Sequence, residues 1–305
     1  VCSSDLLYQN QFDETIAKIA FEGGLYGKEF TTTSPEFGTS GSFAKCWVKE
    51  EDGIYLLKRG SEGARNAGLE PYSEMYASQI ANIICRDSVI YTVEKYHDKL
   101  ASKCKLFTSE REGYVPITKF FDKIVSVKDI LEKFQEYYCE EDFRRMIVLD
   151  ALILNTDRHM GNYGFIVNNE TMQVKRMAPM FDHNQSLLPY AEKEDFKNLD
   201  IYLASRPTQI GEDFNEVAHA LLTPDIQSDL RNLKGFEFEQ NGEYNLPEQR
   251  LKELNRLIDR QIDGILESKR LYIPSNEYTN NLYESEQYNN DISLESDEID
   301  EDLEI

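Results

Sequence analysis

The stretch Asn155-Thr156-Asp157-Arg158-His159-Met160-Gly161-Asn162 carries the strongest signal in this sequence of 305 residues. It follows an apolar helical segment and precedes the strand candidate Tyr163–Val167. A second acid, Asp182, lies after a predicted hairpin in Pro179-Met180-Phe181-Asp182-His183. An aspartate, an asparagine five residues later and a further aspartate after a hairpin form a known arrangement for phosphoryl transfer. The spacing therefore predicts a phosphotransferase site.

Each of these side chains has its own task in such a site. Asp157 orients and deprotonates the attacking hydroxyl, whereas Asn162 and Asp182 hold Mg²⁺ against the nucleotide phosphates. The alternative is that Asp157 and Asn162 only form a turn, as Asp and Asn often do. The second acid at the end of a hairpin favours the catalytic interpretation. His159 is assigned a supporting role, because a loop histidine is more often a hydrogen-bonding group than a ligand or a base.

A candidate phosphate-binding segment lies upstream. It consists of Gly38, Thr39, Ser40, Gly41 and Ser42. Glycines let backbone N–H groups approach phosphate oxygens, and hydroxyls add donors. Lys58 ends an apolar strand and is expected to meet the α and β phosphates, with Glu74 of the following helix as its partner. The plainer alternatives are an ordinary loop, an edge lysine and an acid that compensates a helix dipole.

The order of these features favours one fold class. A glycine-rich loop, a strand lysine, a helix glutamate, a catalytic loop and a metal-binding aspartate follow one another as they do in protein kinases. We therefore expect a two-lobed α+β fold with a small, strand-rich N-lobe at residues 21–118. A mostly helical C-lobe is expected at residues 119–274. Residues 1–20 are left without a defined structure.

The hydrophobic pattern predicts the individual elements. Strands are expected at residues 43–48, 54–58, 89–93, 102–107 and 163–167. Helices are expected from Pro71 onward and at residues 127–138, 140–154, 212–233 and 247–271. Residues 275–305 contain eleven acidic residues and no Lys or Arg. That composition predicts a disordered acidic tail.

The motif Asp157-Arg158-His159-x-x-Asn162, together with Pro179-Met180-Phe181-Asp182, resembles the HipA-like serine/threonine kinases. The resemblance runs from about Phe37 to Tyr190. It implies ATP and Mg²⁺ as cofactors and Ser or Thr of a protein as the acceptor. It also implies autophosphorylation of the phosphate loop in some members, for which Ser40 and Ser42 are the candidate sites here. The adenine is expected against the connector near Lys103, Cys104 and Phe107.

Two departures from kinase patterns limit which properties of known kinases are expected of this chain. Only 37 residues precede Gly38, so antitoxin docking through an N-terminal subdomain, as in the toxin members, is not expected. An antitoxin or regulator is not identifiable from the sequence. Eukaryotic kinases have Asp-Phe-Gly where this chain has Asp182-His183-Asn184, so a switch driven by phenylalanine is not expected either.

The composition limits the remaining function classes. The formal charge is 33 minus 56, or −23, which disfavours nucleic acid and anionic membrane surfaces as partners. Five widely spaced cysteines and the lack of a signal or membrane segment lead us to expect reduced thiols and a cytoplasmic protein. Two alternatives stay open: a phosphoinositide-type lipid or small-molecule kinase, which shares the Asp-Arg-His order, and a catalytically silent module with the kinase fold.

Overall fold

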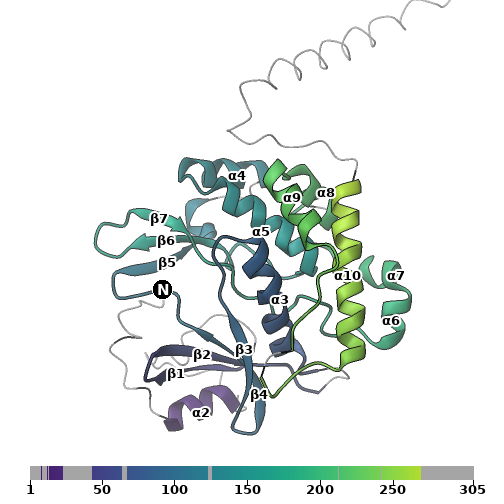
Figure 1. Cartoon of the computed structure of the whole chain (residues 1–305). Coiled ribbons are helices and arrows are strands. Elements are labelled where there is room, and N and C mark those ends of the chain that lie inside the picture. The colour runs from purple at the N-terminus through teal and green to yellow at the C-terminus, as the bar shows by residue number, and fades with distance from the viewer. Residues whose placement is uncertain are drawn as a thin grey trace, which may run out of the picture.

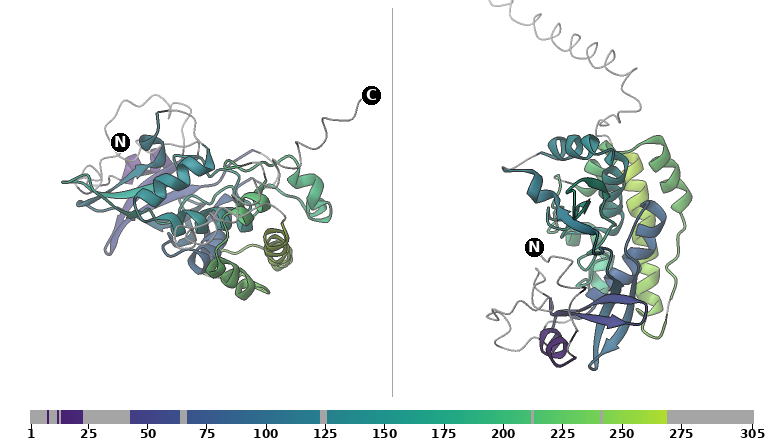
Figure 2. Two further views of the ribbon diagram at one scale, coloured as in Figure 1. Left: turned by 90° about the horizontal axis from the view of Figure 1, so that it is seen from above. Right: turned by 90° about the vertical axis from the view of Figure 1, so that its left-hand side faces the viewer.

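The computed structural model describes residues 8, 12, 14–22, 43–63, 67–122, 126–211, 213–240 and 242–268. The predicted phosphate loop at Gly38 to Ser42 and the predicted acidic tail at 275–305 therefore lie outside the described residues. Within the described part, a four-stranded sheet and the helix Glu14–Glu22 lie at one end of the molecule (Figures 1 and 2). A second sheet and most of the other helices lie toward the opposite end.

The first sheet has four antiparallel strands. In spatial order they are β1 (Lys45–Glu50), β2 (Gly53–Arg59), β4 (Lys99–Lys105) and β3 (Tyr91–Tyr96). Helix α2 (Glu14–Glu22) packs on β1 and β2 through Ala17 and Phe21, in a region for which the sequence predicted no element. Strand β3 begins two residues after its predicted start. Strand β4 begins three residues before its predicted start, because the turn that joins the two strands lies between Tyr96 and Lys99.

Helix α3 (Glu70–Ile84) connects the first sheet to the rest of the molecule. Pro71 lies in its first turn, where a proline costs no hydrogen bond. The helix contacts β3 and β4 on one side and α5 and α9 on another, so that most of its side chains are buried, including two glutamates, Glu70 and Glu74. Figure 1 shows α3 at the centre of the molecule.

The second sheet has three antiparallel strands, in the order β5 (Glu112–Pro116), β6 (Gly164–Asn168) and β7 (Val174–Met177). The expected strand at 163–167 is therefore found one residue later, whereas β5 was not predicted. A side chain at Gly164 would lie 2.2 Å from the carbonyl oxygen of Val115. Glycine is thus required where β6 begins, next to the end of β5.

The remaining elements are mostly helical. They are the 3₁₀ turn η1 (Ile117–Phe120) and the helices α4 (Val127–Glu136), α5 (Glu140–Ile153), α6 (Lys193–Lys197), α7 (Leu199–Leu203), α8 (Phe214–Ala220), α9 (Pro224–Leu233) and α10 (Glu248–Glu267). Ser126 caps α4, as expected, in a capping box with Asp129. The single helix expected at 212–233 is two helices, because Thr223 caps a new helix that begins at Pro224.

Aromatic rings join the helices to the second sheet. The ring of Phe134 in α4 stacks on Phe143 in α5, with centroids 4.9 Å apart, and meets Phe165 in β6 at 4.7 Å. All three side chains are fully buried. Such contacts contribute about 0.5–1.5 kcal/mol per ring pair beyond the burial of apolar area. This cluster fixes the position of α5, which ends immediately before the Asp157 loop.

A buried polar network ties α5 to two loops. Arg158 bonds Asp150 of α5 through Nε and one terminal nitrogen, the shortest contact being 2.9 Å. Its other terminal nitrogen donates to the carbonyl oxygens of Asn162, at 3.1 Å, and Phe181, at 2.6 Å. The network therefore joins the helix, the loop after it and the loop that contains Asp182. Every N–H group of the Arg158 guanidinium has an acceptor once His183 is included.

His183 is fully buried at the edge of this network. Its Nδ1 lies 3.2 Å from a terminal nitrogen of Arg158, and a guanidinium only donates. Nδ1 must therefore accept the bond, which places the proton of the neutral ring on Nε2. Burial and the adjacent Arg158 charge hold the pKa of His183 well below its usual range, although Asp182 opposes them. The folded chain consequently keeps this ring neutral near pH 7.

The lowered pKa of His183 predicts a pH-dependent free energy of unfolding. The unfolded chain takes up a proton at this ring below about pH 6.5, whereas the folded chain does not. The free energy of unfolding should therefore fall as the pH drops from about 7 to 5, by up to about 1.4 kcal/mol per pH unit from this group. Chemical denaturation of wild type and His183→Gln at several pH values measures it.

The glutamine variant retains an acceptor for Arg158 but cannot titrate, so its slope between pH 5 and 7 should be flatter. Identical slopes for wild type and His183→Gln would contradict the assignment of a neutral buried ring.

Candidate functional site

Lys58 lies between two carboxylates from different parts of the fold. Its Nζ is 2.6 Å from Oε1 of Glu74 in α3 and 2.5 Å from Oδ1 of Asp182 in the loop after β7. Ser102, which faces Lys58 across β2 and β4, donates its hydroxyl to the other oxygen of Glu74. The helix, the strand and the loop thus meet at one ammonium group.

Lys58, Glu74 and Asp182 shift one another's pKa values. Burial acts to lower the pKa of Lys58, but the two carboxylates outweigh it and raise that pKa above its usual value. Burial likewise acts to raise the pKa of Asp182, but Lys58 outweighs it and lowers that pKa. Burial raises the pKa of Glu74, which is 1% exposed, against the effect of Lys58. Near pH 7 the ammonium is charged and Asp182 is ionised.

The backbone at Asp182 is held in an unusual conformation. Its φ is 58°, in the left-handed region that Asp tolerates better than most residues. The N–H group of Asp182 donates to the hydroxyl of Tyr91 at 3.1 Å, and the preceding carbonyl accepts from Arg158. The ring of Phe181 packs against Phe107, with centroids 5.2 Å apart. Contacts on both sides therefore fix the direction of the Asp182 carboxylate.

The loop that contains Asp157 is held by its own hydrogen bonds. Oδ1 of Asn155 accepts from the N–H of Asp157 at 3.1 Å, and Nδ2 of Asn162 donates to the carbonyl of Asp157 at 3.1 Å. Burial raises the pKa of Asp157, with Asp182 adding to the shift, while His159 and Lys58 oppose it. A carboxylate with a raised pKa is a better proton acceptor than an ordinary aspartate.

The other predicted residues are placed as follows. Cys104 is buried, and its burial together with the nearby charge of Glu74 raises the pKa of its thiol to about 12, whereas Lys58 opposes the shift. Phe107 contacts the ring of Phe181. Lys103 points to the opposite face of β4, where it pairs with Glu50 at 2.5 Å and Glu94 at 3.2 Å. His159 is exposed, and its Nδ1 accepts from the N–H of Gly161 at 3.0 Å, a bond within the loop.

The donor set fits Mg²⁺ in kind. Because Nδ2 of Asn162 donates to the carbonyl of Asp157, the amide oxygen is the atom of this side chain that would bind a cation. Asp182 adds a carboxylate, and hard oxygen donors suit Mg²⁺, which takes few protein ligands and keeps several waters. Among the residues that the structure describes, no cluster of three or more His, Cys, Asp or Glu side chains is arranged to hold a metal ion. An Mg²⁺ ion on Asn162 and Asp182 would take its remaining ligands from water and phosphate.

Sequence reasoning missed four residues that build this site. Tyr91, Ser102 and Asp150 were not singled out, and Arg158 was quoted in the motif but given no role. The signal for Asp150 was available, because it is a charged residue within the apolar run that leads to the Asp157 loop. Tyr91 and Ser102 carried no comparable signal, since each becomes polar support only through contacts made across the fold.

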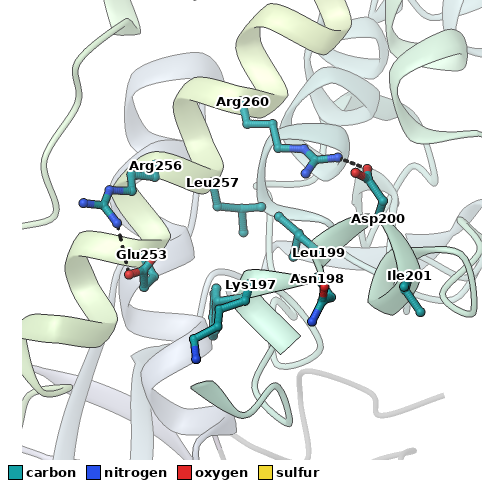
Figure 3. A pocket seen from close by; sticks show the side chains of 10 residues that line it. Lys197, Asn198, Leu199, Asp200, Ile201, Glu253, Arg256, Leu257 and Arg260 are labelled. Carbon is teal, nitrogen blue, oxygen red and sulfur yellow. Dashed lines mark hydrogen bonds and ion pairs between the residues drawn. The ribbon is translucent and has the colours of Figure 1, made fainter. Parts of the chain in front are cut away.

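A pocket of about 410 Å³ lies away from these residues. It is formed between α6, α7 and α10 and contains the ion pairs Arg256–Glu253 and Arg260–Asp200 (Figure 3). None of the residues that line it belongs to the candidate site. The described helices include none that is long and apolar enough to cross a bilayer.

Comparisons with known proteins point to kinases. No family model matches the chain. The serine/threonine-protein kinase CtkA of Helicobacter pylori is 26% identical over 136 residues, which cover 40% of this chain and 42% of CtkA. A crystal structure of the H. pylori proinflammatory kinase CtkA matches with a TM-score of 0.53 and 21% identity, covering 72% of this chain and 92% of that one.

HipA of Shewanella oneidensis MR-1, in a complex with HipB and operator DNA, has a TM-score of 0.43 at 11% identity, covering 78% of this chain and 67% of that chain. The sequence match to CtkA spans less than half of that protein's length. Its solved structure nevertheless has the same β-rich N-terminal part and helical C-terminal part as this chain. The chain is therefore a distant homologue of the kinase CtkA, and its α+β kinase-like fold confirms the predicted fold class.

Proposed function

We propose that the chain transfers the γ-phosphoryl group of ATP to a Ser or Thr hydroxyl of a protein. The observation that carries the proposal is the pairing of Lys58 with both Glu74 and Asp182, at 2.6 and 2.5 Å. In phosphoryl transfer by kinases, a strand lysine held by a helix glutamate binds the α and β phosphates, and a nearby aspartate binds the metal. The ion pairs of Lys58 with Glu74 and Asp182, in a chain with a kinase-like fold, support these three assignments.

Asp157 is the proposed base. It lies on the loop that precedes β6, and burial and the nearby charge of Asp182 raise its pKa, which supports a role as proton acceptor. Its role is to orient the acceptor hydroxyl and receive the proton, a contribution made mainly in the transition state. Asn162 and Asp182 would hold Mg²⁺, which neutralises charge on the transferring phosphate when bound.

A protein acceptor is favoured over a membrane lipid. The matched segment belongs to a serine/threonine-protein kinase, and the formal charge of −23 would repel an anionic membrane surface. Ser40 and Ser42 remain the candidate sites of autophosphorylation, but they lie outside the described residues. The alternative is a catalytically silent module with the kinase fold, and measuring phosphate transfer by the wild-type chain distinguishes the two.

Replacing Asp157 should abolish transfer while nucleotide binding persists. Removal of a positioned base costs about 10²- to 10⁴-fold in rate. Lys58→Met should instead weaken ATP binding and transfer together, because the ammonium contacts the phosphates in the ground state as well. Phosphate incorporation into the chain or an added protein, and calorimetric ATP binding, are measured for wild type, Asp157→Asn and Lys58→Met.

The exposed residue Lys128 in α4 offers a matched control. Its ion-pair partner is Glu132, one turn along the same helix, so Lys128→Met should behave as wild type. Transfer by Asp157→Asn at the wild-type rate would refute the assignment of the base. Absence of transfer by wild type, with ATP bound, would establish the silent module.

The metal assignment makes a separate prediction. Asp182→Asn removes the charge that would attract Mg²⁺, so the dependence of ATP affinity on Mg²⁺ should largely disappear. ATP affinity is measured with and without Mg²⁺ in wild type and in the variant. Asp200→Asn, at an exposed position in α7, should retain the wild-type dependence. An unchanged effect of Mg²⁺ in Asp182→Asn would exclude Asp182 as a ligand.

A further inference from the structure

A second buried glutamate lies at the start of α3, four residues before Glu74. Glu70 is only 2% exposed, and its Oε1 accepts hydrogen bonds from Ser61, in the loop after β2, and from Tyr190, at 2.6 Å. Its other oxygen is buried and has no hydrogen-bond partner among the described residues. A carboxylate buried in this way depends on its two hydroxyl donors, because an unpaired charged oxygen is costly.

Tyr190 approaches Glu70 from the other end of the segment that begins at Asp182. Burial and the bond to Glu70 raise the pKa of the Tyr190 hydroxyl, so it remains a donor near pH 7. Gln185 donates to the same hydroxyl at 3.2 Å. The backbone on either side is held by Arg250, which donates to the carbonyls of Leu188 at 2.6 Å and Ala191 at 2.8 Å. Tyr190 is therefore presented to α3 by a well-anchored segment.

The two glutamates lie one turn apart on the same side of α3, since residues four apart are neighbours on a helix. Glu74 is joined to the start of the 182–190 segment through Lys58, and Glu70 is joined to its end through Tyr190. The segment thus meets the helix at two points about one helical turn apart.

We propose that the Tyr190–Glu70 hydrogen bond is a second anchor that positions α3, and with it Glu74, against Lys58. Tyr190 and Glu70 are positioning residues in this proposal, which rests on the proposed kinase function. Loss of the bond should let the first turns of α3 move away from the segment. The pairing of Glu74 with Lys58 would then be populated less of the time.

Amide hydrogen exchange on the full chain without nucleotide tests the anchor directly. Tyr190→Phe removes only the hydroxyl and should speed exchange in residues 71–84 by about tenfold, the value of one hydrogen bond to a charged group. Glu70→Gln keeps an acceptor oxygen but loses the charge, so its exchange should be faster than in wild type and slower than in Tyr190→Phe. Tyr202→Phe is the matched control, because it removes a tyrosine hydroxyl in α7, where the ring contacts Arg206, outside both α3 and the 182–190 segment.

A double-mutant cycle tests whether the anchor acts through Glu74. Tyr190→Phe should lower the rate of phosphoryl transfer by about tenfold in the wild-type background. In the Glu74→Gln background the same change should cost less than about twofold, because the pairing that it positions is already lost. A residue that merely stabilises the fold would lower the rate by equal factors in both backgrounds.

Two results would overturn the proposal: unchanged exchange in α3 for Tyr190→Phe, or equal losses of rate in the two backgrounds. If wild type transfers no phosphate, the proposed function fails while the exchange measurement still decides the anchor. Faster exchange confined to the variants that lose or weaken the bond would then establish a structural link between the 182–190 segment and α3.

Discussion

The buried contact between Arg158 and Asp150 is the constraint on which the candidate site depends. An isolated charge in this position would be unfavourable by several kcal/mol, so the pair is stable only because every donor of the guanidinium has an acceptor. Those acceptors lie on α5 and on the two loops that contain Asp157 and Asp182. Satisfying one arginine therefore brings the proposed base and the proposed metal ligand together. A lysine could not replace it, because an ammonium has three donors and no planar fork.

The aromatic cluster and the ion pair have different tasks in this arrangement. Phe134, Phe143 and Phe165 hold α5 against the second sheet through area and shape. That packing tolerates small changes in the orientation of the helix. The hydrogen bonds of Arg158, in contrast, fix the backbone atoms of the two loops to within a few tenths of an ångström. The apolar core thus brings the elements together, and the polar network sets the geometry of the loops. Lys58 then links this network to the first sheet through Asp182.

The features with local patterns could be predicted from the sequence. The β1–β2 hairpin, the start of α3 at Pro71 and the cap at Ser126 depend on residues a few positions apart, and the order of Lys58, Glu74, Asp157 and Asp182 predicted the fold class. Strand β5 was missed because Gly113 and Pro116 interrupt it and its partner β6 lies about fifty residues away. Tyr91 and Tyr190 were missed for the same reason, since a tyrosine hydroxyl has no recognisable partner until the chain has folded.

Sequence separation also has a consequence for how the chain folds. The hairpins β1–β2, β3–β4 and β6–β7 join neighbours, whereas Lys58 and Asp182 are 124 residues apart, and Glu70 and Tyr190 are 120 apart. Closing loops of that length carries an entropic cost that only a largely assembled core can offset. The sheets should therefore form before Lys58 meets Asp182 and before Glu70 meets Tyr190. On the ribosome, Lys58 would remain without its aspartate partner until the 124 residues up to Asp182 had also been synthesised.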